Sequence, residues 1–173
     1  MTAPASRLWE QRVSCGSRFL KKFVLVSVAA AVLCGAAFAQ RPATSAATTI
    51  QTRQGHYKQM AAALKGISDQ LRAGSPDLAQ IRPRAALLAD RSVHVLAWFP
   101  HGTGPEAGVR TRAKPEIWSN QQGFRQAGAS FVVAVRTLNS AAMAGDIGRI
   151  RTAFPAVQRA CAGCHDNFRA PEH

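Results

Sequence analysis

Residues 147–169 read IGRIRTAFPAVQRACAGCHDNFR, and apolar side chains recur in them every three or four positions. Such spacing places these side chains on one face of an amphipathic helix. The same stretch holds Cys161 and Cys164, and His165 follows directly. Two cysteines separated by two residues and followed by histidine form the motif through which c-type haems are attached. The stretch therefore predicts covalent haem attachment through Cys161 and Cys164, with His165 as the axial iron ligand.

The alternative interpretation of this motif is a chance Cys-x-x-Cys pair, such as a redox-active dithiol beside an unrelated histidine. No alternation of strands and helices surrounds the pair, as it does in thioredoxin-like proteins. A structural zinc site would need more ligands than the two cysteines supply. A second axial ligand, if there is one, must come from upstream, because few residues follow His165 in the sequence.

The first 39 residues resemble a signal peptide. Arg18, Lys21 and Lys22 precede an uncharged run of 17 residues from Phe23 to Ala39. The run ends in the small-x-small pattern Ala-Phe-Ala, which predicts cleavage after Ala39 and export to the periplasm, without a stable membrane anchor. A retained anchor is the alternative, although the run is at the short limit for spanning a bilayer. Cleavage removes Cys15 and Cys34 and leaves a predicted haem domain of residues 40–173.

The mature chain is basic. From Gln40 onward it has 17 Lys/Arg and 8 Asp/Glu residues, a net charge of +9. Two haem propionates would lower this to about +7. Such a surface suits an acidic redox partner protein or an anionic membrane face. Nucleic acid is disfavoured as a partner, because the arginines are scattered without interleaved aromatic residues and the chain is exported.

Apolar periodicity predicts an all-α fold with four amphipathic helices and no strands. We expect the second to begin at Ser75-Pro76-Asp77 and to run to Phe99, and the third to open at Pro115-Glu116. Gly145 and Asp146 separate the third from the fourth. Long helices with short connections predict an antiparallel up-down-up-down four-helix bundle that encloses one haem. Pro155 should kink or split the fourth helix, because it cannot donate to the Arg151 carbonyl.

The first helix supplies candidates for the opposite wall of the haem pocket. Arg53 occupies a core-facing position, where a guanidinium needs a buried anion, and a haem propionate would serve. The alternative is that Arg53 simply reaches solvent. Tyr57 lies one turn later on the same face and would stand over the sixth position of the iron; it could equally be an ordinary core aromatic residue. A Met ligand at Met60 would instead make the haem six-coordinate.

Other candidates are weaker. Arg169 lies one turn after His165 and could shield the proximal imidazole, or it could be a solvated cation favoured by the helix dipole. Four further histidines carry no motif: His56, His94, His101 and His173. We expect His56 to lie on the surface, because it points about 100° away from Tyr57 on a helical wheel.

Taken together, these residues resemble those of cytochrome c′, the high-spin class II c-type cytochromes. The resemblance spans about residues 49–170 and is carried by Arg53-Gln54, by Phe99–Thr103 and Lys114–Trp118 around a long loop, and by Cys161–Arg169. It implies a periplasmic protein, often a homodimer, here through the first two helices. It also implies a five-coordinate haem whose distal face is closed by the residue four after the arginine, which is Tyr57. The loop between Gly102 and Lys114 is longer than the family's pattern.

Two functions remain open from the sequence. The first is electron transfer, with the basic surface steering the protein to an acidic partner. The second is binding of diatomic gases, nitric oxide or carbon monoxide, at an open iron position screened by Tyr57. An enzyme is disfavoured, because no distal histidine, acid or base occupies a recognisable position. The low-spin electron carrier with Met60 as ligand stays the alternative.

Overall fold

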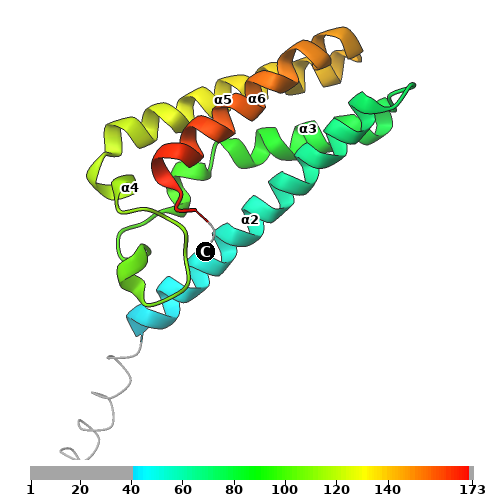
Figure 1. The fold of residues 1–173 in the computed structure, drawn as a ribbon. Coiled ribbons are helices and arrows are strands. Elements are labelled where there is room, and N and C mark those ends of the chain that lie inside the picture. Colours follow the sequence, from blue (N-terminus) through cyan, green and yellow to red (C-terminus); the bar gives the residue numbers. More distant parts are fainter. Residues whose placement is uncertain (1–40, 172–173) are drawn as a thin grey trace, which may run out of the picture. The chain divides into compact units, whose positions relative to one another are not determined.

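The structure is a computed structural model that describes residues 41–171, and the side chains of residues 45–171 (Figure 1). The predicted signal peptide, its cleavage site after Ala39, and His173 lie outside the described residues. Within residues 41–171 the regular structure is helical, and the only β-type pairing is one isolated bridge. The helices are α2 (Arg41–Arg72), α3 (Leu78–Ser92), η1 (Val95–Trp98), η2 (Pro105–Ala107), α4 (Glu116–Ser119), α5 (Gln121–Ala144) and α6 (Ile147–Phe168).

The four long helices α2, α3, α5 and α6 form the predicted antiparallel four-helix bundle. Figure 1 shows α5 and α6 running side by side, with α3 packed against α5. The connections between α2 and α3 and between α5 and α6 are short, which forces each pair to be antiparallel. The long connection lies between α3 and α5, and it carries η1, η2 and α4.

Helix ends follow from side chains that satisfy the free backbone N–H groups of the first turn. Asp146 caps α6 as predicted, and its carboxylate accepts a hydrogen bond from the Arg149 N–H at 2.9 Å. Gly145 ends α5 with φ 75°, a left-handed conformation that glycine adopts without strain. The cap of α3 is Asp77 and not Ser75, because the Asp77 carboxylate accepts from the Ala79 N–H at 2.8 Å.

Two predicted helices are interrupted. The second does not continue to Phe99: α3 ends at Ser92, and the chain tightens into the 3-10 helix η1. The third does not run unbroken from Glu116, because Asn120 leaves the helical conformation. Its side chain accepts from the Gly123 N–H at 3.0 Å and so starts α5 afresh. An internal N-cap of this kind competes with the helix and favours a break.

The predicted split at Pro155 is wrong. Helix α6 is continuous from Ile147 to Phe168, with Pro155 inside it. Pro155 and Arg151 are both exposed, so water can bind the Arg151 carbonyl that proline leaves without its helical donor.

The core is divided into two clusters. The main cluster fills the bundle with buried aliphatic side chains such as Ile67, Leu88, Leu138 and Val157. A smaller aromatic cluster lies at one end; its buried members are Ile117, Phe124 and Phe168. The second cluster matters for function because Cys164 packs against it.

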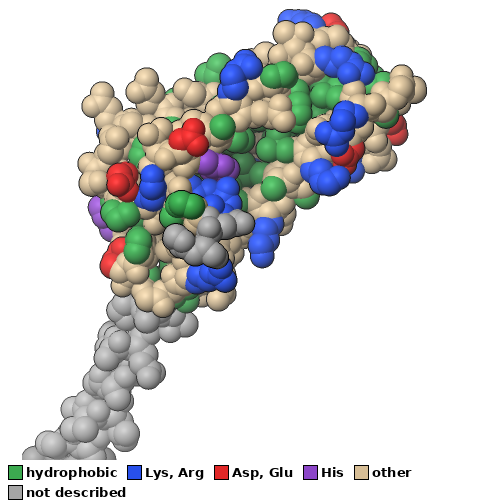
Figure 2. All heavy atoms as spheres, in the orientation of Figure 1, with side chains coloured by type: hydrophobic (Ala, Val, Ile, Leu, Met, Phe, Trp, Pro, Cys, Tyr) green, Lys and Arg blue, Asp and Glu red, His purple; other side chains and the backbone are tan. Residues whose placement is uncertain are grey.

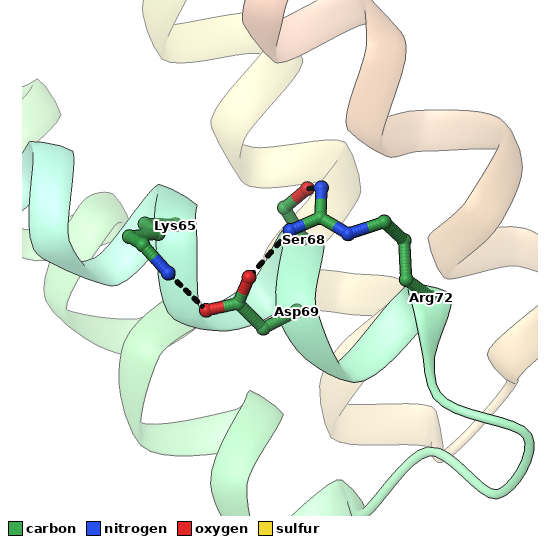
Figure 3. A network of polar contacts seen from close by, with 4 residues as sticks. All are labelled: Lys65, Ser68, Asp69 and Arg72. Carbon is green, nitrogen blue, oxygen red and sulfur yellow. Dashed lines mark hydrogen bonds and ion pairs between the residues drawn. The ribbon is translucent and has the colours of Figure 1, made fainter.

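The C-terminal turns of α2 carry exposed ion pairs, shown in Figure 3. Lys65 Nζ lies 2.7 Å from the Asp69 carboxylate, and Arg72 bonds to Ser68 and Asp69. The hydrogen bond from Lys65 lowers the pKa of Asp69. Pairs this exposed add little to stability. Among the described residues, no helix is long and apolar enough to cross a membrane.

Candidate haem-binding site

Helix α6 presents Cys161, Cys164 and His165 at the end of the bundle, and all three are half-buried. Cys161 packs against the main core, whereas Cys164 packs against the aromatic cluster of Ile117, Phe124 and Phe168. Both cysteines are free thiols. The two sulfurs therefore lie along one wall of the bundle, each with apolar side chains beside it, which is the environment that a porphyrin edge needs.

Both thiols are protonated at neutral pH. Burial, helped by the neighbouring Cys164, raises the pKa of Cys161 to about 11. Burial also raises the pKa of Cys164. Catalytic cysteines have a lowered pKa, because the thiolate is the nucleophile. Neither cysteine of this pair has the lowered pKa that is typical of a catalytic thiol.

His165 is held as a neutral imidazole. Burial lowers its pKa, and the positive charges of Arg169 and Arg112 lower it further, whereas Asp166 acts in the opposite direction. Arg169 Nη1 lies 3.5 Å from His165 Nδ1, as expected for residues four apart on a helix. Neutral imidazole is the form that ligates a metal. Because Nδ1 is the ring nitrogen beside Arg169, Nε2 is the candidate ligand atom.

Tyr57 of α2 faces the two cysteines from across the bundle. Its ring is half-buried and packs against the main core. Burial raises the pKa of Tyr57 well above its ordinary value; ionised Cys164 and Cys161 would raise it further, and Arg53 acts in the opposite direction. Tyr57 is thus a neutral phenol, and both Tyr57 and Cys161 pack against the main core.

Arg53 is buried, with 2% of its surface exposed, so the alternative in which it reaches solvent is wrong. Its guanidinium donates to Thr103 Oγ1 at 2.8 Å, to the Thr103 carbonyl at 2.7 Å and to Thr111 Oγ1 at 2.8 Å. The guanidinium carbon also lies 4.6 Å from the centre of the Phe99 ring. Burial lowers the pKa of Arg53, an effect that Tyr57 and Glu106 partly oppose. Arg53 therefore fastens the long loop to α2.

The same loop reaches α6. Thr111 Oγ1 also accepts from the Ala113 N–H at 3.2 Å, and Ala113 forms the isolated antiparallel bridge with Arg169. Gln54 donates to the Arg110 carbonyl at 3.0 Å. Residues 103–114 thus tie the helix that carries Arg53 and Tyr57 to the helix that carries His165 and Arg169.

The remaining candidates are Met60 and the other described histidines. Met60 is 5% exposed and belongs to the main core, against which Tyr57 and Cys161 also pack. His94 and His101 are exposed. His56 is only half-buried rather than fully on the surface, because its ring stacks on Trp98 with a centroid distance of 4.7 Å.

Sequence reasoning missed the partners that hold these residues. Thr103, Thr111, Trp98 and Trp118 carry no motif of their own, and their roles arise from the path of the loop. Trp118 Nε1 donates to the Phe99 carbonyl at 3.1 Å, which fixes the corner where η1 ends. The available signal was the pair of segments Phe99–Thr103 and Lys114–Trp118, but their spacing does not show which atoms meet.

The arrangement fits a covalently attached haem. Figure 2 shows a hollow between α2 and α6, lined by hydrophobic side chains, with histidine and Lys/Arg side chains at its edge. Two thiols, a neutral histidine, a buried arginine and an apolar wall supply what the porphyrin, the iron and the propionates need. No cluster of three or more His, Cys, Asp or Glu side chains that could hold a bare metal ion occurs in the part of the chain that is described.

The chain is similar to proteins of one family both in sequence and in structure. The family model described as Cytochrome C' matches residues 48–169. The cytochrome c′ of Allochromatium vinosum is 33% identical over 153 residues, which cover 86% of this chain and 99% of that protein. A crystallised cytochrome c′ with ligand-controlled dimer dissociation superposes with a TM-score of 0.67 and 30% identity, covering 73% of this chain and 97% of the other. A ferrous variant of the Alcaligenes xylosoxidans cytochrome c′ with bound nitric oxide superposes with a TM-score of 0.64 and 30% identity. The match covers 72% of this chain and 94% of the other.

Proposed function

Because this chain belongs to the cytochrome c′ family, we propose that it is a periplasmic monohaem cytochrome that binds diatomic gases, transfers electrons, or does both. Haem c is the cofactor of this family and of this chain. When bound, it supplies an iron that exchanges one electron and takes up a small ligand. Cys161 and Cys164 provide the two thioether links, and His165 Nε2 provides the axial ligand.

The observation that carries the proposal is the position of Tyr57. It is the residue of α2 that faces the two cysteines, and it is a neutral phenol across the physiological pH range. A neutral phenol is a poor iron ligand. Met60, the ligand in the alternative hypothesis, is three residues further along α2, about 4.5 Å by helical rise, so Met60 and Tyr57 cannot both lie over the iron. Tyr57 therefore closes the distal face by bulk, which favours a five-coordinate, high-spin iron.

Gas binding follows from this closure. Tyr57 must move before a ligand reaches the distal face, so a small ligand is favoured over a larger one. A relative from Alcaligenes xylosoxidans has been crystallised with nitric oxide, which supports the same ligand here. Carbon monoxide is the second candidate, and it is the more convenient probe because its association is easily followed by absorbance.

Electron transfer is supported by the charge of the surface. Between Gln121 and Phe168 the chain has five arginines and two acids, Asp146 and Asp166. These residues form most of α5 and α6, the latter of which carries the haem motif. Such a surface attracts an acidic redox partner, and the rate of reaction with it should fall as salt screens the charges.

The proposal includes no enzymatic step. Both cysteines are used as thioether links, and the histidine nearest to Tyr57 in the sequence, His56, stacks on Trp98. Arg53 holds a haem propionate in addition to the loop, since a guanidinium has five N–H donors and three of its hydrogen bonds go to Thr103 and Thr111. Arg169 shields the proximal imidazole.

A homodimer formed through α2 and α3 is part of the proposal. A structural neighbour is named for a dimer that dissociates under ligand control, which makes the oligomeric state worth measuring with and without gas. Export to the periplasm rests on the predicted signal peptide of residues 1–39.

Visible and electron paramagnetic resonance spectra of the ferric protein test the iron site directly. We expect a high-spin spectrum, and Tyr57→Ala should raise the association rate of carbon monoxide because a packed ring no longer has to move. A low-spin spectrum with a Met–iron charge-transfer band would contradict the proposal. It would make Met60 the ligand and electron transfer the main function.

A further inference from the structure

The ring of Tyr57 is in contact with two consecutive aromatic residues, Trp98 and Phe99. Trp98 meets it edge to face, with a centroid distance of 5.5 Å and an interplanar angle of 87°. Phe99 lies 6.3 Å away at 52°. Edge-to-face contacts of this kind are attractive and orient both rings. Two consecutive residues at the end of η1 therefore pack against the Tyr57 ring.

The corner that presents these two rings is itself fixed. Val95, the first residue of η1, is buried in the main core. At the other end, Trp118 Nε1 donates to the carbonyls of Phe99 and Pro100. Thr103, which Arg53 holds, donates to the Pro100 carbonyl at 2.8 Å. Trp98 thus sits on a short segment whose two ends cannot easily shift.

Trp98 is the middle ring of three, between Tyr57 and His56. It is half-buried, with Tyr57 on its inner side and His56 stacked on it at 4.7 Å and 29°. Helix α2 supplies both His56 and Tyr57, and η1 supplies the ring between them. A Tyr57 ring that leaves its place toward η1 must therefore displace Trp98.

We propose that Trp98 is the positioning residue of the distal pocket: it keeps Tyr57 over the distal face and so limits how fast ligands enter. This inference rests on the proposed function, since it requires that Tyr57 cover that face. Trp98 acts through Tyr57 and does not touch the ligand. Removing one aromatic contact should weaken the restraint by a factor of about 2 to 10.

A double-mutant cycle tests the proposal in the haem-loaded protein. Association rates of carbon monoxide are measured for the parent protein, Trp98→Ala, Tyr57→Ala and the double variant. We expect Trp98→Ala to raise the rate about 2- to 10-fold when Tyr57 is present and to change nothing when it is absent. An equal increase in both backgrounds would show that Trp98 is an independent barrier, and no increase in either would show that it restrains nothing; both results overturn the proposal.

Two matched variants and one structural measurement complete the test. Trp98→Phe keeps a ring at the same place and should restore a rate close to that of the parent protein, and it remains informative if the alanine variant folds poorly. His56→Ala removes the outer ring and should leave the rate within about twofold; a larger rise would move the role from Trp98 to His56. A crystal structure of Trp98→Ala should show Tyr57 in more than one position, and a single unchanged position contradicts the proposal.

The failure of this inference differs from the failure of the proposed function. If Tyr57→Ala alone does not speed carbon monoxide association, Tyr57 does not close the pocket and the proposed function loses its basis. If Tyr57→Ala speeds association but Trp98→Ala does not, only the role of Trp98 is lost.

Discussion

Replacing Arg53 with leucine should destabilise the folded protein strongly, because one buried guanidinium holds the long loop at three points. The change removes hydrogen bonds of 2.8, 2.7 and 2.8 Å to Thr103 and Thr111, and the contact with Phe99 at 4.6 Å. Thr103 is only 3% exposed, so water cannot readily replace the lost donors.

The magnitude follows from the number and kind of bonds. A hydrogen bond to a charged group contributes about 1.5–3 kcal/mol. Three bonds from one guanidinium are not additive, and leucine avoids the cost of burying a charge. The free energy of unfolding should therefore fall by about 3 kcal/mol, less than the sum of three bonds. For a domain of this size each kcal/mol lowers Tm by about 3 °C, so Tm should fall by about 10 °C.

Thermal unfolding of the haem-loaded protein, followed by circular dichroism, measures this shift. The matched control is Arg110→Leu, the same substitution at an exposed arginine of the same loop. Equal melting temperatures for the two variants would refute the reasoning. The redox potential separates the two roles of Arg53, which are to hold the loop and to pair with a propionate. Arg53→Lys keeps the charge beside a propionate and should retain much of the redox potential. Lysine cannot reproduce the forked hydrogen bonds to Thr103 and Thr111, so the stability should still fall.

Two further predictions concern the cofactor and pH. The double variant Cys161→Ala with Cys164→Ala should contain no covalently attached haem, so acid–acetone should extract all haem from the denatured protein. The chain should also lose helicity, because the space between the helices is left unfilled. Haem that stays with the denatured double variant would contradict the attachment site. Because burial raises the pKa of Tyr57 above that of an unfolded tyrosine, about 10, the unfolded chain releases this proton first, so the contribution is complete below pH 10 and is lost as pH rises further. In denaturant titrations above pH 10, the free energy of unfolding of Tyr57→Phe should therefore fall less steeply with pH than that of the parent protein, by about 1.4 kcal/mol per pH unit. Identical pH dependence in the two proteins would show that the phenol is not buried. Tyr57 is the single tyrosine in the sequence, which makes the comparison unambiguous.

Much of the fold could be predicted because it depends on local patterns. The spacing of apolar residues identified the four long helices, and Asp146 with Gly145 marked one junction correctly. The errors occurred where two local signals competed. Ser75 and Asp77 are both good caps, and only the position of the first helical turn decides between them. Asn120 could have continued a helix, but its side chain instead caps a new one.

The site could be predicted only in part, for a related reason. Helical spacing places Arg53 and Tyr57 on one face, and the haem motif places Cys161, Cys164 and His165 on another. Arg53 binds Thr103 and Thr111, which lie 50 and 58 positions later in the chain. They belong to an irregular loop whose path no periodicity describes. The sequence argument that a buried guanidinium needs an anion overlooked neutral acceptors, here two threonines.

The segment from Thr103 to Lys114 also has a consequence for how the protein can vary in length. Surface loops usually accept inserted residues easily. Here Thr111 receives bonds from α2 and from Ala113, and Ala113 is paired with Arg169 at the end of α6. The few residues between these anchors act as a spacer that sets the width between the two helices, and hence the thickness of the group that fits there. Related chains should therefore differ in length at the exposed tip around Pro105–Gly108 and keep a constant length from Arg110 to Lys114.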